Sequence, residues 1–448
     1  MLNGPLWPKL LLFALPLMAS SVMQLLFNAA DVIVVGRYAG DASLAAVTST
    51  GSLVNLLVNL FMGLSIGTNV IAAHALGRED NEALEKTVHT AILISFIGGV
   101  ILTVVGFFLS PILLEIMDSP DNVIGLSSLY LRIYFLGMPA MLVYNFGSSL
   151  LRAYGDTRRP MIYLAIAGVV NVGLNMYLVI VFHLDVAGVA IATVISQYIS
   201  CALVLLCLTR ETGPLHLDLK KLRIDPTALK NIAVIGLPAG LQGMVFSLSN
   251  MVIQSSVNSF GDIVMAGSGA AANIEGFVYV SMNAFYQSCL TFTGQNYGAG
   301  KLKRVDRVIL LCEGFVALSG ILCGGLAYAF ATPLLHIYSP SDEVVAWGIL
   351  RMTYVCLPYF LCGIMDVLVG ALRGLGTSVV PMCVSIAGVC GVRLMWIFTI
   401  FRAIHTPESL FLSYPVSWIA TALIHFCCLL VVRKRAYKKL EAAEAVST

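Results

Sequence analysis

The chain has 448 residues, of which 58% are hydrophobic and only 11% are charged, and its formal net charge is +2. A soluble domain carries about 25% charged residues, so this chain has too few to cover a surface that faces water. We therefore expect an integral membrane protein that lies in the lipid bilayer, and the small net charge gives no indication of nucleic-acid binding.

Apolar runs long enough to cross a bilayer follow one another along the whole chain. A helix needs about 20 residues to span the hydrocarbon core. The runs are separated by short turns and lack the alternation of membrane strands, so helices and not a barrel satisfy the backbone. The sequence predicts an all-α protein with twelve membrane-spanning helices, near residues 8–35, 44–76, 87–110, 127–151, 160–182, 187–209, 229–258, 263–296, 306–329, 346–372, 378–401 and 411–432.

The second half of the chain repeats the first at a distance of about 221 positions. The repeated features are a Leu-Pro pair, a loop glycine, a mid-span proline, and a Leu-Arg pair followed by Gly and Pro. They occur at residues 15–16 and 237–238, at Gly77 and Gly298, at Pro139 and Pro358, and at residues 151–160 and 372–381. Such duplication is common in membrane carriers and indicates two pseudo-symmetric six-helix bundles, in which the mid-span prolines kink their helices.

The distribution of basic residues predicts the orientation of the chain. With twelve spans, most of the 26 Lys and Arg residues fall in loops on one side, which is the cytoplasmic side by the positive-inside rule. Both termini are then cytoplasmic, the protein lies in the inner (plasma) membrane, and the two six-span halves form a parallel repeat. We expect an N-terminal lobe at 1–209, a cytoplasmic linker at 210–228, a C-terminal lobe at 229–432 and a cytoplasmic tail at 433–448, with Asp225-Pro226 beginning the seventh span.

Charged residues inside the predicted spans are the first candidates for function, since a charge in the membrane is costly unless it is paired or faces water. They are Asp31, Arg132, Glu275, Glu313, Arg351, Asp366 and Arg393. Counting along straight helices places Glu275 and Arg393 deepest. Two interpretations stay open for them: a buried Glu-Arg pair that stabilises the C-terminal half, or a site for an ion or substrate. For Arg132, Arg351 and Glu313 we expect side chains that reach towards the membrane surface.

Asp31 continues a polar stripe along the first span. Gln24 and Asn28 precede it at helical spacing, so the three side chains share one helix face. The same count along straight helices places Asp31 and Asp366 nearer one membrane face than the middle. The stripe indicates a water-filled cavity, with Gln24 and Asn28 as candidates for contact with a substrate.

Several segments together resemble one known family. Residues 28–37, with the sequence NAADVIVVGR, resemble the first-helix motif of multidrug and toxin extrusion (MATE) transporters. The Leu-Arg motifs at 151–160 and 372–381, the segment 185–193 and the segment 294–300 are also similar to the family. The resemblance covers nearly the whole chain and implies a prokaryotic-type secondary antiporter. Such a protein exports small organic compounds, often cationic, in exchange for inward H⁺ or Na⁺ by alternating access, functions as a monomer and needs no cofactor.

The resemblance also implies roles for particular residues. The cation or proton site of the N-terminal lobe would comprise Asp31, Asn171, Asn175 and Thr193, with Na⁺ at Asp31 the one metal ion implied. Asn175 stands where many relatives carry an acid, so this lobe has one carboxylate fewer. Asp366 matches an acid of the tenth span in one subgroup, but the acid that accompanies it there is replaced by Phe246. We hypothesise that Glu275 takes its place, which makes Glu275, Asp366 and Arg393 the candidate binding residues of the C-terminal lobe.

Other functions fit the sequence less well. A lipid-linked oligosaccharide flippase of the same superfamily would share the bundles, but it should add spans or a strongly cationic cavity. An enzyme is not expected, because Gly63-Leu-Ser-Ile-Gly67 and Gly267-Ser-Gly269 match catalytic or nucleotide-binding motifs only as strings and lie in predicted spans. Their small residues suit close helix packing. A channel would not require kinked, duplicated halves.

Overall fold

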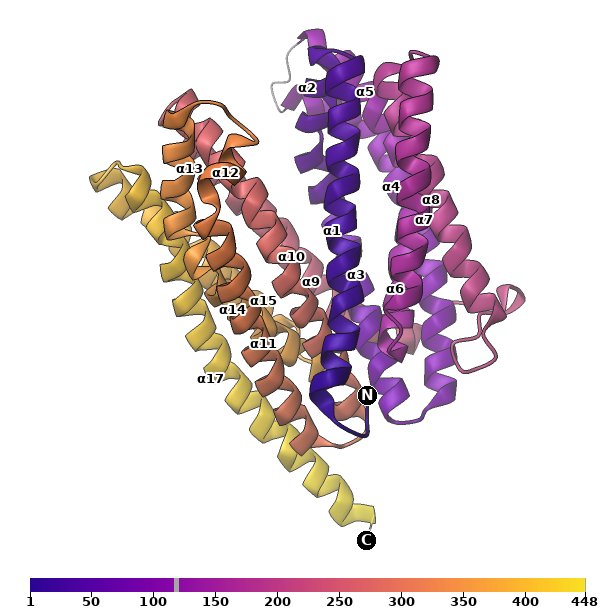
Figure 1. Ribbon diagram of the computed structural model, residues 1–448. Helices are drawn as coiled ribbons and strands as arrows, with labels where there is room; N and C mark the ends of the chain where they lie inside the picture. The colour runs from indigo at the N-terminus through magenta and orange to yellow at the C-terminus, as the bar shows by residue number, and fades with distance from the viewer. Residues whose placement is uncertain (117–120, 448) are drawn as a thin grey trace. The chain divides into compact units, whose positions relative to one another are not determined.

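The computed structural model describes residues 1–116 and 121–447, and all regular structure in these residues is helical. Eleven helices are long and apolar enough to cross a membrane. A twelfth span is obtained when α5 (Asp121–Phe135) and α6 (Met138–Tyr154), which meet at a bend of 48°, are counted together. The predicted all-α class and the twelve predicted spans are confirmed (Figure 1).

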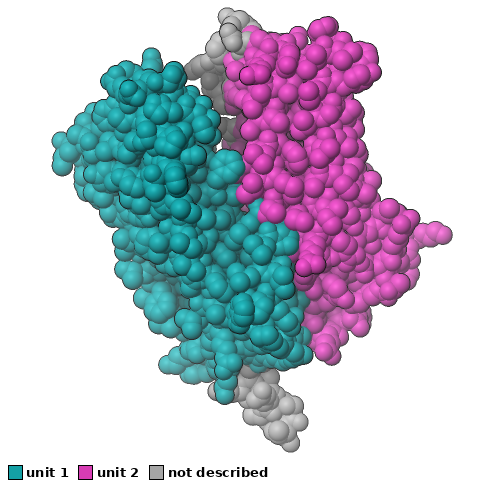
Figure 2. All heavy atoms as spheres, in the orientation of Figure 1, with its two compact units in different colours: residues 1–18, 241–448 teal, residues 19–240 magenta. Residues whose placement is uncertain are grey.

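The helices form two compact units, coloured separately in Figure 2. The N-terminal unit comprises residues 19–240, and the C-terminal unit comprises residues 1–18 and 241–448. The start of α1 (Leu6–Tyr38) therefore belongs to the C-terminal unit, and the start of α9 (Pro226–Asn258) belongs to the N-terminal unit. The expected boundaries at 209 and 229 follow the order of the chain, whereas the compact units exchange these two helix starts.

Two hydrophobic clusters form the core of the N-terminal unit. One takes residues from most helices of the unit and includes Leu131, Phe135 and Leu142, while the other includes Phe146, Leu150 and Ile232. Ile232 shows how the start of α9 is held: its side chain is fully buried in this unit. The remaining elements of the unit are α2 (Asp41–Ser49), α3 (Gly51–Gly77), α4 (Asn81–Ile116), α5 (Asp121–Phe135), α6 (Met138–Tyr154), α7 (Arg158–Met176), the π-helix η1 (Tyr177–Val181), α8 (Asp185–Arg210) and the 3₁₀-helix η2 (Leu219–Lys221).

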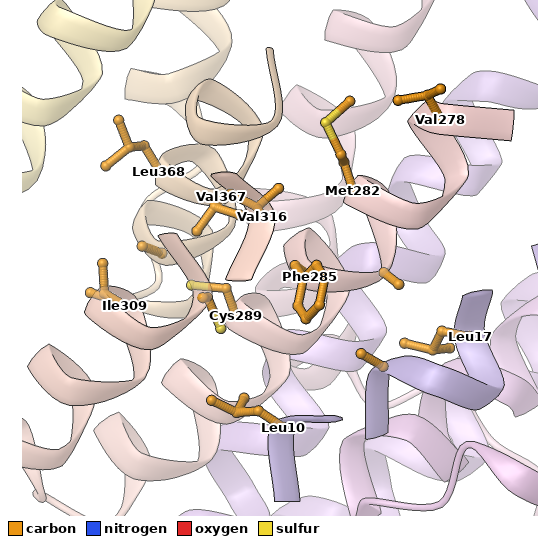
Figure 3. Close-up of a cluster of buried hydrophobic side chains, with 14 of the residues drawn as sticks. Leu10, Leu17, Val278, Met282, Phe285, Cys289, Ile309, Val316, Val367 and Leu368 are labelled. Atoms are coloured by element: carbon orange, nitrogen blue, oxygen red, sulfur yellow. The ribbon is translucent and has the colours of Figure 1, made fainter. Parts of the chain in front are cut away.

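The described core of the C-terminal unit has two apolar clusters, of which the larger lies around α10, a helix that packs against α11, α13 and α14 (Figure 3). Leu10 and Phe13 from the start of α1 are buried in the larger cluster, and the Phe13 ring meets Phe292 edge to face at 5.4 Å. The unit contains α10 (Asp262–Gly298), α11 (Leu302–Ala329), α12 (Ala331–His336), α13 (Asp342–Tyr354), the 3₁₀-helix η3 (Leu357–Tyr359), α14 (Phe360–Gly374), α15 (Val379–Ser385), the π-helix η4 (Ile386–Gly391), α16 (Val392–Trp396), the π-helix η5 (Ile397–Phe401) and α17 (Pro407–Ser447).

The repeated Leu-Arg motif is a helix end built twice. In the first copy Gly155 has a φ of 109°, and the next amide, that of Asp156, donates to the Leu151 carbonyl at 2.9 Å. In the second copy Gly376 has a φ of 86°, and Thr377 donates to the Leu372 carbonyl at 3.0 Å. Glycine is required at both positions because a side chain disfavours a positive φ, so the repeat preserves a way of ending a helix.

The matched prolines lie at breaks in the fourth and tenth spans. Pro139 lies at the start of α6, directly after the 48° bend, and Pro358 lies in η3 between α13 and α14. Pro16 and Pro238, in contrast, lie inside the continuous helices α1 and α9. The predicted kink is therefore found at Pro139, whereas at Pro358 the span changes to the 3₁₀-helix η3.

The string Gly63-Leu-Ser-Ile-Gly67 is a packing surface, as expected. It lies on α3 opposite the start of α9, where a Cβ added to Gly63 would meet the Gly240 nitrogen at 2.1 Å and one added to Gly67 would meet the Ile232 carbonyl at 2.3 Å. Both helices thus present glycines four residues apart, which lets their backbones approach closely. The predicted helix start at Asp225-Pro226 is also confirmed, since the Asp225 carboxylate accepts the Ala228 amide at 2.8 Å.

Candidate functional sites in the two units

Three of the four residues expected at the N-terminal cation site are joined to Asp31 by a chain of hydrogen bonds. Asn175 Nδ2 donates to the Asp31 carboxylate and also to Asn171 Oδ1, at 3.3 Å in the second case. Asn171 Nδ2 in turn donates to Thr193 Oγ1 at 3.4 Å. Helices α1, α7 and α8 therefore meet here through polar side chains, and Asn171 and Asn175 are buried.

In the described part of the chain, the Asp31 carboxylate has no basic partner, since no Lys, Arg or His forms an ion pair with it. The Oδ1 atom of Asn175 is fully occluded and lacks a hydrogen-bond partner within the same part of the chain. The site thus combines a half-buried carboxylate with an unsatisfied amide oxygen, and both atoms are acceptors that a proton or a small cation could satisfy.

Gln24 and Asn28 lie apart from this hydrogen-bonded chain. Both side chains are exposed, while Asp31 is half-buried. Two tyrosines that the sequence did not indicate also lie near the site: Tyr130 and Tyr134 of α5 are within electrostatic range of Asp31, and their ring centres are 5.7 Å apart in a stacked arrangement. Their i, i+4 spacing places both rings on one helix face and was the one sequence feature that could have indicated them. Such pairs are common on buried helix faces, so the spacing does not distinguish a functional site.

In the C-terminal unit, Glu275 is paired with an arginine other than the expected one. Arg351 Nε and Nη2 donate to the two Glu275 oxygens at 3.1 and 2.9 Å, and Arg351 Nη1 donates to Ser268 Oγ at 2.9 Å. Both charged side chains are buried. The expectation that Arg351 reaches the membrane surface is wrong, and so is the interpretation in which Glu275 pairs with Arg393.

Arg393 instead lies against aromatic rings. Its guanidinium carbon is 4.3 Å from the centre of the Tyr414 ring and 5.6 Å from that of Trp418, and its Nε donates to Ser417 Oγ at 2.9 Å. Asp366 is half-buried on α14 beside Tyr279 and forms no ion pair with the described residues. The structure therefore places Glu275, Asp366 and Arg393 in one unit without joining them directly.

The remaining intramembrane charges differ in their surroundings. Arg132 is exposed and lies over the Phe107 ring at 5.3 Å, as expected for a side chain that reaches outwards. Glu313 does not reach outwards. Both its carboxylate oxygens are occluded, and neither has a hydrogen-bond partner in the described residues. Its side chain lies beside Cys289 of α10. The expectation that Glu313 reaches the membrane surface is therefore wrong.

The duplicated scaffold is also found by comparison with known families. The family model MatE matches the chain twice, over residues 16–177 and 238–399, which together make up more than half of it. This chain belongs to the MatE family. The two matches coincide with the two halves of the repeat, and members of this family are membrane transporters and not enzymes.

Relatives of this MatE chain are named for different substrates. It is 27% identical to the probable multidrug resistance protein YoeA of Bacillus subtilis, covering 93% of this chain and 92% of that one. It is 25% identical to an FAD transporter of Shewanella oneidensis, covering 86% of each. A solved structure of an outward-facing multidrug resistance MATE family transporter matches with a TM-score of 0.90 at 20% identity, covering 98% of each chain. That structural likeness concerns the fold of this MatE chain.

Proposed function

We propose that this chain exports small organic compounds across the inner membrane in exchange for inward H⁺ or Na⁺, and that Asp31 carries the coupling ion. The duplicated MatE scaffold and relatives named as multidrug resistance proteins support export. The observation that carries the assignment of Asp31 is its hydrogen bond from Asn175, in a site without a basic partner among the described residues. A buried carboxylate of this kind is stabilised by taking up a proton or a cation.

The orientation of the Asn175 amide suggests how loading could change the site. The amide now donates through Nδ2 to Asp31 and leaves Oδ1 unsatisfied. A half-turn of the amide would bring Oδ1 next to the carboxylate, which is unfavourable unless a proton or Na⁺ lies between the two oxygens. Loading would thus rearrange hydrogen bonds that join α1 to α7 and α8, and a helix rearrangement of this kind would link ion binding to alternating access.

Both termini are proposed to face the cytoplasm. The N-terminal backbone is bound by the turn before α11, since Lys301 Nζ donates to the Leu2 carbonyl at 3.0 Å and Arg304 Nη2 to the Met1 carbonyl at 3.0 Å. The C-terminal helix reaches the same turn of α11, where Arg433 Nε donates to Asp306 at 2.6 Å. The two ends of the chain therefore lie at the same end of the C-terminal unit, where basic residues gather, as the positive-inside rule requires.

The coupling is tested by dye efflux from proteoliposomes with Na⁺ and pH gradients imposed separately. Wild-type protein is expected to export cationic dyes under at least one gradient, and Asp31→Asn is expected to lose this gradient-driven efflux while remaining folded and inserted. Asp262→Asn, which changes an exposed aspartate of α10, is the matched control. Wild-type efflux that responds to neither gradient would contradict the antiporter, and gradient-driven efflux retained in Asp31→Asn would contradict the role of Asp31.

A further inference from the structure

Arg393 is a buried arginine of the C-terminal unit that lacks an acidic partner. Its side chain is 5% exposed, and its one hydrogen bond within the described residues is the bond from Nε to Ser417. None of the ion pairs in that part of the chain includes Arg393. Because a buried charge without a partner is costly, a guanidinium left in this state calls for an explanation beyond packing.

The other two buried arginines of the unit have hydrogen-bond partners at both terminal nitrogens. Arg351 uses all three nitrogens on Glu275 and Ser268. Arg373 donates through Nη1 to the Tyr286 hydroxyl at 2.8 Å and through Nη2 to Gln242 Oε1 at 2.9 Å. In both cases the two terminal nitrogens are bound. Arg393 is thus unlike its neighbours at the nitrogens that form the guanidinium fork.

The two terminal nitrogens of Arg393 are also accessible. Neither Nη1 nor Nη2 has a hydrogen-bond partner in the described residues, yet neither belongs to the fully occluded atoms that lack one. Both therefore keep some surface open to a ligand. A pair of guanidinium nitrogens binds the two oxygens of a carboxylate through parallel hydrogen bonds, which is the strongest neutralising contact available to this group.

An aromatic surface lies next to the free fork. Tyr414 lies under the guanidinium, Trp418 stacks on Tyr359 with ring centres 5.3 Å apart and planes at 24°, and Tyr359 stacks on Tyr279 at 6.1 Å and 27°. Trp418 is 3% exposed and Tyr359 is stacked on two other rings, whereas Tyr414, which contacts the guanidinium, is half-buried. The partly exposed Tyr414 ring is therefore the aromatic surface that a bound ligand can contact.

The three buried arginines of the unit differ in whether a carboxylate pairs with them. Arg351, Arg373 and Arg393 are buried, whereas Glu275 is the one carboxylate in an ion pair with any of them in the described residues. Asp366 lies beside Tyr279 and within electrostatic range of Arg373, and it forms no ion pair with the described residues. An anionic ligand at Arg393 would neutralise the charge of its guanidinium, whereas a cationic ligand there would be repelled.

We propose that Arg393 binds the carboxylate of an organic anion through its two terminal nitrogens, next to the Tyr414 ring. This inference rests on the proposed export function and names a substrate class for the C-terminal unit. It differs from a purely structural role of Arg393, since a structural arginine is expected to have its fork satisfied by the protein, as in Arg351.

Two xanthene dyes with the same ring frame and opposite charges test whether the charge of the ligand decides its binding. Fluorescein carries a free carboxylate and is anionic at pH 7.5, whereas rhodamine 123 has the same planar three-ring frame, a methyl ester in place of the carboxylate, and a positive charge. Binding of each dye to the purified full-length protein in lipid nanodiscs is measured by fluorescence anisotropy. The variants are Arg393→Gln, Arg393→Lys and, as the matched control, Arg402→Gln, which removes an exposed arginine that follows η5.

Arg393→Gln is expected to raise the Kd for fluorescein by about 10- to 100-fold, the range for loss of a charge-assisted hydrogen-bond pair. Arg393→Lys should lie between this variant and the wild type, because it keeps the charge and loses the fork. Rhodamine 123 should bind no more weakly to Arg393→Gln than to the wild type, and Arg402→Gln should leave both affinities unchanged.

Equal fluorescein affinity in the wild type and Arg393→Gln would overturn the inference. If Arg393→Gln does not fold, the test uses Arg393→Lys. Unchanged fluorescein affinity in Arg393→Lys would then overturn the inference. Failure here is distinguishable from failure of the proposed function, because gradient-driven efflux of rhodamine 123 by the wild type is measured independently of fluorescein binding.

Discussion

The interiors of the two units differ in how they hold charge. In the N-terminal unit Asp31 is held by neutral side chains, first Asn175 and through it Asn171 and Thr193. In the C-terminal unit Glu275 is held by the guanidinium of Arg351 in a two-point ion pair. A carboxylate held by amides can exchange a proton or a cation at small cost, whereas one held by a guanidinium is already neutralised.

This difference shows that the two repeats share helix ends and helix breaks but not their charged side chains. Gly155 and Gly376 end helices in the same way, and Pro139 and Pro358 break matched spans. The charged residues do not correspond in this manner, so each unit acquired its own polar interior on a shared scaffold. We therefore expect ion coupling and ligand recognition to respond to different substitutions in the two units.

The largest effect is expected from breaking the Glu275–Arg351 pair. Arg351→Gln leaves Glu275 buried without its counter-ion, which costs about 3–5 kcal/mol of unfolding free energy. Replacing both residues, as in Glu275→Leu with Arg351→Met, should recover most of this loss because no uncompensated charge remains. The measurement is chemical unfolding of the purified variants in detergent micelles.

The exposed ion pair of the same unit provides the control. Arg433 donates to Asp306 at 2.6 and 2.8 Å, but its side chain is 46% exposed. Asp306→Asn is expected to cost less than about 1 kcal/mol, the usual value for a solvent-screened pair. Similar losses for Asp306→Asn and Arg351→Gln would show that burial does not set the strength of the Glu275 pair.

A smaller and graded effect is expected at the amides that hold Asp31. Asn175→Leu removes a hydrogen bond to a charged group, worth about 1.5–3 kcal/mol, whereas Asn171→Leu removes bonds between neutral groups, worth about 0.5–1.5 kcal/mol. Initial rates of gradient-driven dye efflux should therefore fall more in Asn175→Leu than in Asn171→Leu. If coupling resides in the C-terminal unit instead, neither variant will lower the rate and Asp366→Asn will.

The features predicted correctly from the sequence are those set by local interactions. Span lengths follow from apolar runs, the helix ends at Gly155 and Gly376 follow from a required positive φ, and the start of α9 follows from capping by Asp225. The proximity of Asn171 and Asn175 follows from the i, i+4 spacing of one helix, and the two side chains do form a hydrogen bond.

The pairing of charges was not predicted, because it depends on helix rotation and not on sequence spacing. Counting along straight helices assumes 3.6 residues per turn, but η4 directly precedes α16 and a π-helix turn contains more residues, so the direction of Arg393 is shifted. Arg351 lies on α13, which η3 separates from α14 and which packs against α10. The packing of α13 against α10 brings Arg351 to Glu275, and this packing is not encoded in the spacing of residues along the chain.

The smallest effect is expected at Arg132, which occupies a place in the first half similar to that of Arg351 in the second. Arg132 is exposed, and its described contact is with the face of the Phe107 ring at 5.3 Å. Arg132→Gln should therefore cost no more than about 1 kcal/mol, the value of an exposed cation–π contact. Unfolding under the conditions used for Arg351→Gln gives a direct comparison of two arginines at similar positions. A loss for Arg132→Gln as large as that for Arg351→Gln would mean that the difference between the units lies elsewhere than in the partners of their arginines.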